Sequence, residues 1–298
     1  MNRKAFILAM ITIIGWASGF AGVSASLQGG FSPGNLILYR LLVASLLFLL
    51  YAILPSSRIR LPHKKDLPLI ITLGIVGITF YHVGVTFGQQ YINAGTTSMI
   101  VGSAPIFTTI IAVLFLKEKM EWYSWVGLFV GFIGVSLITI GTGDFSFTFS
   151  KGILPALFAT ICTSIFFVYQ KPLLQKYDPI ELTAYFTWAA TIPLFIFFPS
   201  LIENLQTTTL EANLAVLYVG AIPAAACYAM WAIATSLGEI SKLSTLLYLE
   251  TPIAIIVAWI WLGELPTVLS MIGGFITIAS VAVVNFIASR KNQQKGAT

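Results

Sequence analysis

Apolar residues run along this chain in ten long stretches that are separated by short polar connections. A helix that crosses a bilayer needs about 20 mostly apolar residues, and each stretch reaches that length. We therefore predict an all-α polytopic membrane protein with ten transmembrane helices. The predicted spans are 5–27, 33–54, 67–91, 94–116, 122–142, 152–171, 180–199, 212–235, 242–262 and 267–289.

The composition supports this pattern and excludes several functions. The 298 residues are 57% apolar and 9% charged, whereas a soluble domain carries about 25% charge. The connections leave no room for a soluble catalytic domain. The sequence has no phosphate-binding GxxxxGK[ST] motif and no HExxH motif, and both cysteines, Cys162 and Cys227, fall inside spans. These features argue against ATP hydrolysis, a metal site, a disulfide framework and an enzyme.

The net charge of +5 gives the orientation. If the N-terminus is cytoplasmic, every basic residue except Arg40 and Lys151 falls within or near the inner connections. This is the positive-inside asymmetry of inner-membrane proteins. We therefore predict a multi-pass protein of the cell inner membrane with both termini in the cytoplasm and a basic tail at 291–298. The basic residues set the topology, so we expect a lipid bilayer and no nucleic acid as a partner.

The two halves of the chain resemble each other. Motifs recur at a separation of 146 or 147 residues, and a five-span unit therefore occurs twice, at 1–143 and 151–290. Because five is odd, the second unit must enter the membrane from the opposite side. Inverted repeats of this kind are a common architecture of secondary transporters. The matching positions are Pro33 with Pro179, Tyr39 with Tyr185, Tyr81 with Tyr228, Pro105 with Pro252, Glu118 with Glu264 and Gly127 with Gly273.

Several motifs together resemble a known family. They are Gly15-Trp16-Ala17-Ser18-Gly19-Phe20, Tyr39-Arg40-Leu41, and a Leu-x-Glu sequence that ends at Glu118 and again at Glu264. With the duplicated ten-span plan, they resemble the EamA-type drug/metabolite transporters over about residues 5–289. The resemblance implies ten helices, export of small metabolites, amino acids or drug-like compounds, and no bound cofactor. Arg40 and Glu250 depart from the repeat, because their partners are Phe186 and Ser103.

Glu250 is the strongest candidate for a functional residue. It lies in the apolar stretch Leu243–Leu262, where a carboxylate costs about 2.5–3.5 kcal/mol near the bilayer centre. Pro252 follows two residues later and leaves the Tyr248 carbonyl without its helical donor. We expect Glu250 to bind an amine or cationic group of the substrate, or to carry a coupling proton.

Arg40 is the second charge placed within a span. Its position puts it about 10 Å from the outer end of its helix, and Glu250 lies about 12 Å from the inner end of its own. In a core of about 30 Å the two differ in depth by about 8 Å. A water or substrate bridge between them is therefore easier than a direct ion pair. A structural alternative is that Arg40 extends to the outer headgroups.

The remaining candidates are prolines and aromatic residues. Pro105 and Pro252 interrupt helices at corresponding positions, which is a sequence pointer to a transport site. An aromatic cavity suits amphipathic or cationic substrates. For each residue the alternative is simple packing, and for His82 a satisfied core position. The candidates for the cavity are Trp16, Tyr81, His82, Tyr228, Trp231 and Tyr248.

We therefore expect a secondary transporter that exports small organic solutes by alternating access. One alternative is an exchanger or importer of phosphorylated or nucleotide-linked solutes, which needs several buried basic residues. Another is a membrane-embedded enzyme acting on lipid-linked substrates. The small-residue pair Gly127 and Gly131 favours close helix packing within the bundle, with a homodimer as the alternative.

Overall fold

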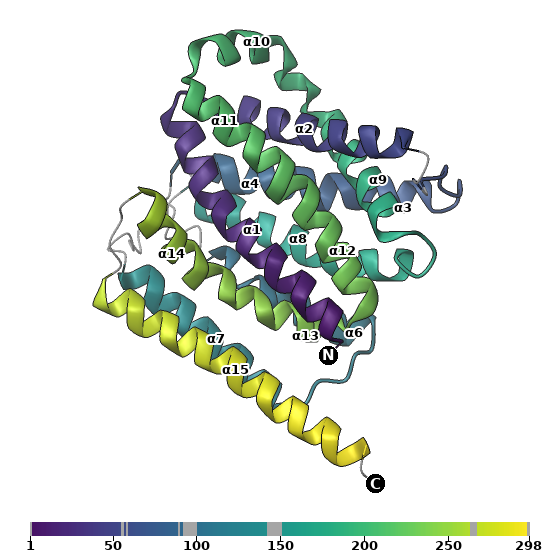
Figure 1. Cartoon of the computed structure of the whole chain (residues 1–298), viewed down its shortest axis with the longest axis vertical. Helices are drawn as coiled ribbons and strands as arrows, with labels where there is room; N and C mark the ends of the chain where they lie inside the picture. The colour runs from purple at the N-terminus through teal and green to yellow at the C-terminus, as the bar shows by residue number, and fades with distance from the viewer. Residues whose placement is uncertain are drawn as a thin grey trace.

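The computed structural model describes residues 2–54, 57, 59–88, 90, 91, 100–141, 151–262 and 267–296. In this part of the chain the regular secondary structure is entirely helical, and both termini lie near the same end of the bundle (Figure 1). Three features predicted above lie outside the described residues: Glu264, the first residues of span 94–116 and the boundary at 143. The α-helices are α1 (Arg3–Gln28), α2 (Pro33–Ile53), α3 (Leu67–Gly74), α4 (Tyr81–Gly88), α6 (Ala104–Phe115), α7 (Trp122–Gly141), α8 (Ile153–Leu173), α9 (Pro179–Thr191), α10 (Phe198–Thr207), α11 (Leu210–Val219), α12 (Tyr228–Leu237), α13 (Ile240–Ser244), α14 (Glu250–Leu262) and α15 (Val268–Gly296).

Several of these α-helices are joined end to end by short 3₁₀- or π-helical segments and form longer continuous rods. A π-helix, η1 (Ile75–Phe80), connects α3 to α4, and a second, η3 (Gly220–Cys227), connects α11 to α12. The 3₁₀ segments η2 (Ile192–Phe197) and η4 (Thr245–Leu249) connect α9 to α10 and α13 to α14. Such segments often mark functional positions inside membrane helices. The two π-helices end directly before Tyr81 and Tyr228, the tyrosines that match in the two halves.

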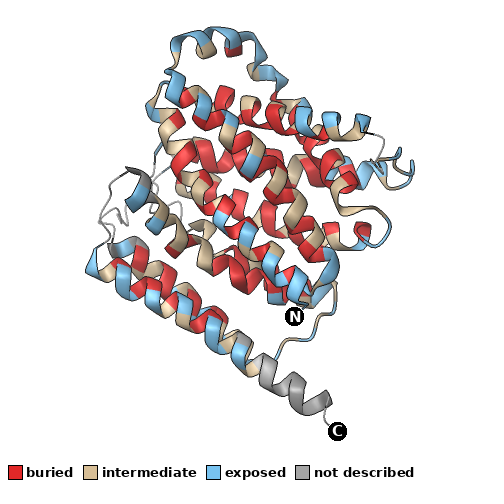
Figure 2. Cartoon of the chain, viewed as in Figure 1, coloured by how far each residue is buried: buried red, intermediate tan, exposed pale blue. Residues whose placement is uncertain are grey.

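Seven helical rods are long and apolar enough to cross a membrane, and the protein is therefore a multi-pass membrane protein. They are Arg3–Gln28, Pro33–Ile53, Leu67–Gly88, Ile153–Leu173, Pro179–Thr207, Leu210–Leu237 and Ile240–Val257. Three shorter apolar helices, Ala104–Phe115, Trp122–Ile138 and Val268–Val284, occupy the other predicted spans. Large apolar side chains remain exposed along the outer helix faces, while the centre of the bundle is buried (Figure 2). This is the distribution that a bilayer solvent requires.

The predicted prolines lie where two helices restart. Pro105 is in the first turn of α6, directly after a turn at Gly102 and Ser103. Pro252 is in the first turn of α14, directly after the 3₁₀ turns of η4. Proline fits the first turn of a helix because the amide proton that it lacks has no partner there. Both interruptions therefore have a local cause in the sequence.

Glycines allow close packing between elements from the two halves. A side chain at Gly15 would meet Cys227, and one at Gly19 would meet Pro223, so α1 packs antiparallel against the rod formed by α11, η3 and α12. In the same way Gly77 faces Phe166, and Gly84 faces Pro155 and Ala159, where η1 and α4 pack against α8. Small residues drive such close approaches in membranes.

The helices α7 and α15 form a pair at the edge of the bundle (Figure 1). Gly127 faces Val284, Gly131 faces Tyr248 and Ser280, and Gly134 faces Thr277. The glycine face of α7 thus packs within the chain, as the simpler interpretation of the sequence expects. The homodimer through Gly127 and Gly131 stays a prediction.

Candidate functional site

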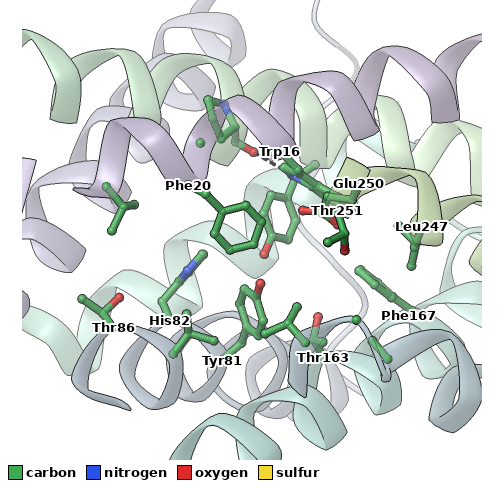
Figure 3. Close-up of a pocket in the computed structure, with 18 of the residues that line it drawn as sticks. Trp16, Phe20, Tyr81, His82, Thr86, Thr163, Phe167, Leu247, Glu250 and Thr251 are labelled. Atoms are coloured by element: carbon green, nitrogen blue, oxygen red, sulfur yellow. Dashed lines mark hydrogen bonds between the residues drawn. The ribbon is translucent and has the colours of Figure 1, made fainter. Parts of the chain in front are cut away.

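A cavity lies in the interior of the bundle, where helices from both halves meet. The first half contributes α1, α2, α4 and α6, and the second contributes α8, η3, α12, η4 and α14. Figure 3 shows Trp16 and Glu250 on one side of this cavity, with Tyr81, His82 and Thr163 across from them. The lining residues are Trp16, Gly19, Phe20, Val23, Arg40, Tyr81, His82, Val85, Thr86, Val101, Gly102, Ala104, Pro105, Thr163, Phe167, Pro223, Tyr228, Leu247, Glu250 and Thr251.

Arg40 enters the cavity from α2. Only 7% of this residue is exposed, so the structure buries it instead of extending it to the headgroups. Its Nε atom is fully buried and has no hydrogen-bond partner among the described residues. Burying a charge without a partner is costly. The guanidinium is therefore available to an anionic group that enters the cavity.

Glu250 enters the cavity from the first residue of α14, directly after the 3₁₀ turns of η4. Within the described part of the chain its carboxyl group accepts no hydrogen bond, and no ion pair joins it to Arg40. The cavity therefore presents one guanidinium group and one carboxyl group that form no ion pair with each other.

Aromatic rings form the wall around these charges. The Trp16 ring stacks on Phe167 with centroids 5.9 Å apart and meets Tyr228 edge-on at 5.3 Å. The Trp16 Nε1–H donates to the Pro223 carbonyl oxygen at 3.0 Å. That bond fixes the orientation of the ring. Trp16 thus presents a rigid apolar surface to the cavity.

His82 and Tyr81 lie side by side on α4. Their rings are 5.0 Å apart, and His82 also meets Tyr228 at 6.4 Å. The His82 Nε2 atom is buried without a hydrogen-bond partner in the described residues. Tyr81 and Tyr228 both interact electrostatically with Arg40 and Glu250. The two matching tyrosines therefore lie near both Arg40 and Glu250.

Of the ten residues predicted for the site, the structure brings seven to the cavity wall. Trp231, Tyr248 and Pro252 do not line it. Trp231 is buried behind the wall, where its ring contacts Trp16 at 5.4 Å and Phe167 at 5.2 Å. Tyr248 is directed toward Gly131 and Ser280. The seven lining residues are Trp16, Arg40, Tyr81, His82, Pro105, Tyr228 and Glu250.

Sequence reasoning missed Phe20, Thr163, Phe167 and Thr251, which also line the cavity. The signal for Phe20 and Thr251 was their position in the sequence, because Phe20 lies one helical turn beyond Trp16 and Thr251 directly follows Glu250. No comparable signal marked Thr163 and Phe167, which lie one turn apart on α8.

Comparisons with known proteins agree with this architecture. The model of the EamA-like transporter family matches residues 3–140 and again residues 150–286. An uncharacterized transporter of Bacillus subtilis, YdfC, is 37% identical over 98% of this chain and 95% of its own. A probable terminal-alkyne amino-acid exporter of Streptantibioticus cattleyicolor is 32% identical over 95% of this chain and 93% of its own. One solved crystal structure shares the fold with a TM-score of 0.80 at 16% identity, covering 97% of this chain and 99% of that one.

Proposed function

Since the chain belongs to the EamA-like transporter family, we propose that it exports small amino-acid-like solutes that carry both an ammonium and a carboxylate group. Relatives in this family are named as transporters, so the protein is a transporter and not an enzyme. Export and an amino-acid-like substrate are also supported by the Streptantibioticus relative, which is named a probable amino-acid exporter.

The observation that carries the proposal is the pair of unpartnered charges in one cavity. Arg40 offers hydrogen-bond donors suited to a carboxylate, and Glu250 offers acceptors suited to an ammonium group. Each charge alone is costly in a low-dielectric interior. A zwitterionic solute would satisfy both at once, whereas a simple amine or a simple acid would satisfy one.

The aromatic wall favours an apolar or aromatic side chain on this solute. Trp16, Phe20 and Phe167 surround the space next to Glu250 with ring surfaces. Aromatic pairs are stabilising in stacked or edge-on arrangements. Phosphorylated or nucleotide-linked solutes fit less well, because Arg40 is the only lysine or arginine among the described lining residues and phosphate binding normally uses several.

Transport would proceed by alternating access between two inverted five-helix halves that together form ten membrane helices. Three observations support this arrangement. The family model matches the chain twice, and Tyr81 shares the cavity with Tyr228, its match in the second half. The packing is also reciprocal, because α1 packs on α12 and α14 while α8 packs on α4 and α6. The charge asymmetry further supports cytoplasmic termini in the inner membrane.

Glu250 would also couple export to protons. A carboxyl group inside a membrane is costly in its charged form, which is why such residues commonly serve in proton relays. Binding of an ammonium group and binding of a proton would compete for the same carboxylate. Proton entry from outside would then release the solute and reset the transporter.

A resistance screen tests the proposed function. Cells that overproduce the protein are challenged with toxic amino-acid analogues, with the matching amines, and with cationic dyes. We expect resistance and lower intracellular levels for the zwitterionic analogues, compared with cells that produce Glu250→Gln at the same level. Resistance to dyes alone, or to no compound in cells with normal protein levels, would contradict the proposal.

A further inference from the structure

The cavity extends from its centre toward one end of the bundle only. On α1 the lining residues progress from Trp16 through Phe20 to Val23, away from the N-terminus, and on α4 they progress from Tyr81 to Thr86. The opening therefore follows the seam between α1 and α4. On α8, by contrast, the lining ends at Phe167, and on α12 it ends at Tyr228.

The corresponding seam in the second half lies between α8 and α12, and it is closed. The Phe167 and Trp231 rings meet there at 5.2 Å, and Trp16 covers Trp231 at 5.4 Å. Phe20 and Val23 line the open seam, whereas Gln170 is 2% exposed.

Behind these rings lies a group of polar atoms that have no hydrogen-bond partner within the described residues. They are Gln170 Nε2 on α8, and Trp231 Nε1 and Thr235 Oγ1 on α12. Gln170 lies about one helical turn after Phe167 on α8, and Thr235 lies about one helical turn after Trp231 on α12. Both therefore lie on the C-terminal side of the Phe167–Trp231 contact. Buried polar groups normally have partners, so three such atoms beside one seam require an explanation.

The end of this seam is closed by an ion pair. Lys171 Nζ, on the residue after Gln170, donates to Glu118 Oε1 at 2.8 Å and to the Gly238 carbonyl oxygen at the end of α12, also at 2.8 Å. Glu118 accepts three further bonds from α13, through the Ile240 amide, the Ser241 amide and the Ser241 hydroxyl. This network, which we call the α8–α12 latch, ties α8 to the segment that leads into η4 and Glu250.

We propose that the seam between α8 and α12 is the second entrance to the cavity, lined by Gln170, Trp231 and Thr235 and closed by the α8–α12 latch. This inference rests on the proposed function, because it names the passage that alternating access needs. In the alternate state the three polar groups meet water and substrate. In the present state the Lys171–Glu118 pair holds the seam shut.

Cysteine labelling in lipid nanodiscs, where solvent meets both faces, tests this directly. In a Cys162→Ala, Cys227→Ala background, Thr235→Cys is treated with a sulfonatoethyl methanethiosulfonate reagent, with and without a transported solute. We expect slow labelling at rest. The rate should rise about tenfold or more when Lys171→Met or Glu118→Gln shifts the equilibrium toward the open seam. Adding a transported solute to the protein with an intact latch should also raise the labelling rate of Thr235→Cys.

The matched control is Thr277→Cys on α15, a threonine that is equally buried and faces Gly134 on α7. It should stay unlabelled in every condition, and labelling of both cysteines would overturn the inference by indicating general unfolding. If the background protein transports the solute but Thr235→Cys remains unlabelled during turnover and in both latch variants, the inference fails while the proposed function stands. If the wild-type protein moves no solute, the proposed function itself fails.

Discussion

Arg40 and Glu250 come from opposite halves of the chain and line one cavity without forming an ion pair with each other. Neither charge has a counterpart in the repeat, since Phe186 and Ser103 occupy the matching positions. The two halves of the chain therefore contribute different chemical groups to one cavity, with the Arg40 guanidinium from the first half and the Glu250 carboxyl group from the second. This difference is the basis of the predictions that follow.

Replacing Glu250 with glutamine should reduce solute affinity while leaving the fold intact, because glutamine keeps the shape and removes the charge. A charged hydrogen bond contributes about 1.5–3 kcal/mol, so we expect a loss of about 10- to 150-fold. Transport into proteoliposomes should also lose its dependence on a pH gradient. Glu239→Gln is the control, because its side chain is exposed and pairs only with Lys242 among the described residues. Unchanged affinity and pH dependence in Glu250→Gln would refute this role.

Replacing Arg40 with methionine should change selectivity in addition to affinity. The variant keeps the apolar stem but loses the partner for a carboxylate, so binding of an amino acid should weaken by about 10- to 150-fold. Binding of the corresponding amine should change little. Equilibrium binding of both ligands to purified protein measures the difference. Arg60→Met, at an exposed position, should behave as wild type, and an equal loss for both ligands in Arg40→Met would argue against carboxylate recognition.

Close packing at Gly84 should not tolerate a methyl group. An added Cβ would lie 2.5 Å from the Pro155 carbonyl oxygen and 2.8 Å from Ala159 Cβ, and backbone cannot move away cheaply. We expect Gly84→Ala to destabilise the protein by about 1–3 kcal/mol. Gly274→Ala is the matched control, because its nearest neighbour, Pro252 Cβ, would be 3.7 Å away. Thermal unfolding in detergent should show a lower Tm for Gly84→Ala alone, and equal Tm values would contradict this packing.

Acid should weaken the α8–α12 latch through Glu118. Burial raises the pKa of this carboxyl group, but the hydrogen bonds from Lys171 and Ser241 outweigh burial and hold its pKa below the ordinary value. A group with a lowered folded pKa contributes stability above its unfolded pKa, about 4.3. That contribution disappears as the pH falls through the folded pKa.

Thermal unfolding of wild type and Glu118→Gln between pH 7 and about pH 2 measures this contribution. The wild type should be the more stable at pH 7, and the difference in Tm should stay nearly constant down to the unfolded pKa and shrink only below it. A difference that stays constant over this range would show that Glu118 does not titrate with the latch.

The sequence predicted the large features because the bilayer imposes them. Helix length follows from membrane thickness, and the restarts at α6 and α14 follow from Pro105 and Pro252. The cost of burying charge singled out Arg40 and Glu250. The π-helix at Ile75–Phe80 was not predicted, because it contains no proline and its one glycine, Gly77, also fits an ordinary helix.

The finer arrangement of the cavity needed the structure. Phe20 and Thr163 carry no burial cost that would single them out in a membrane sequence. Trp231 has the right chemistry but lies almost one turn beyond Tyr228, behind the Trp16 ring. Tyr248 is one position beyond the lining residue Leu247, so its side chain is directed toward α7. Depth and rotation depend on how helices pack, and the chemical type of a residue does not specify them.

The most direct test of the account is a structure of the protein with a bound amino acid chosen from the resistance screen. We predict density between Arg40 and Glu250, with the carboxylate at the Arg40 guanidinium, the ammonium group at the Glu250 carboxylate, and the side chain against Trp16 and Phe167. A ligand bound outside this cavity, or bound within it without contacting either charge, would contradict the account.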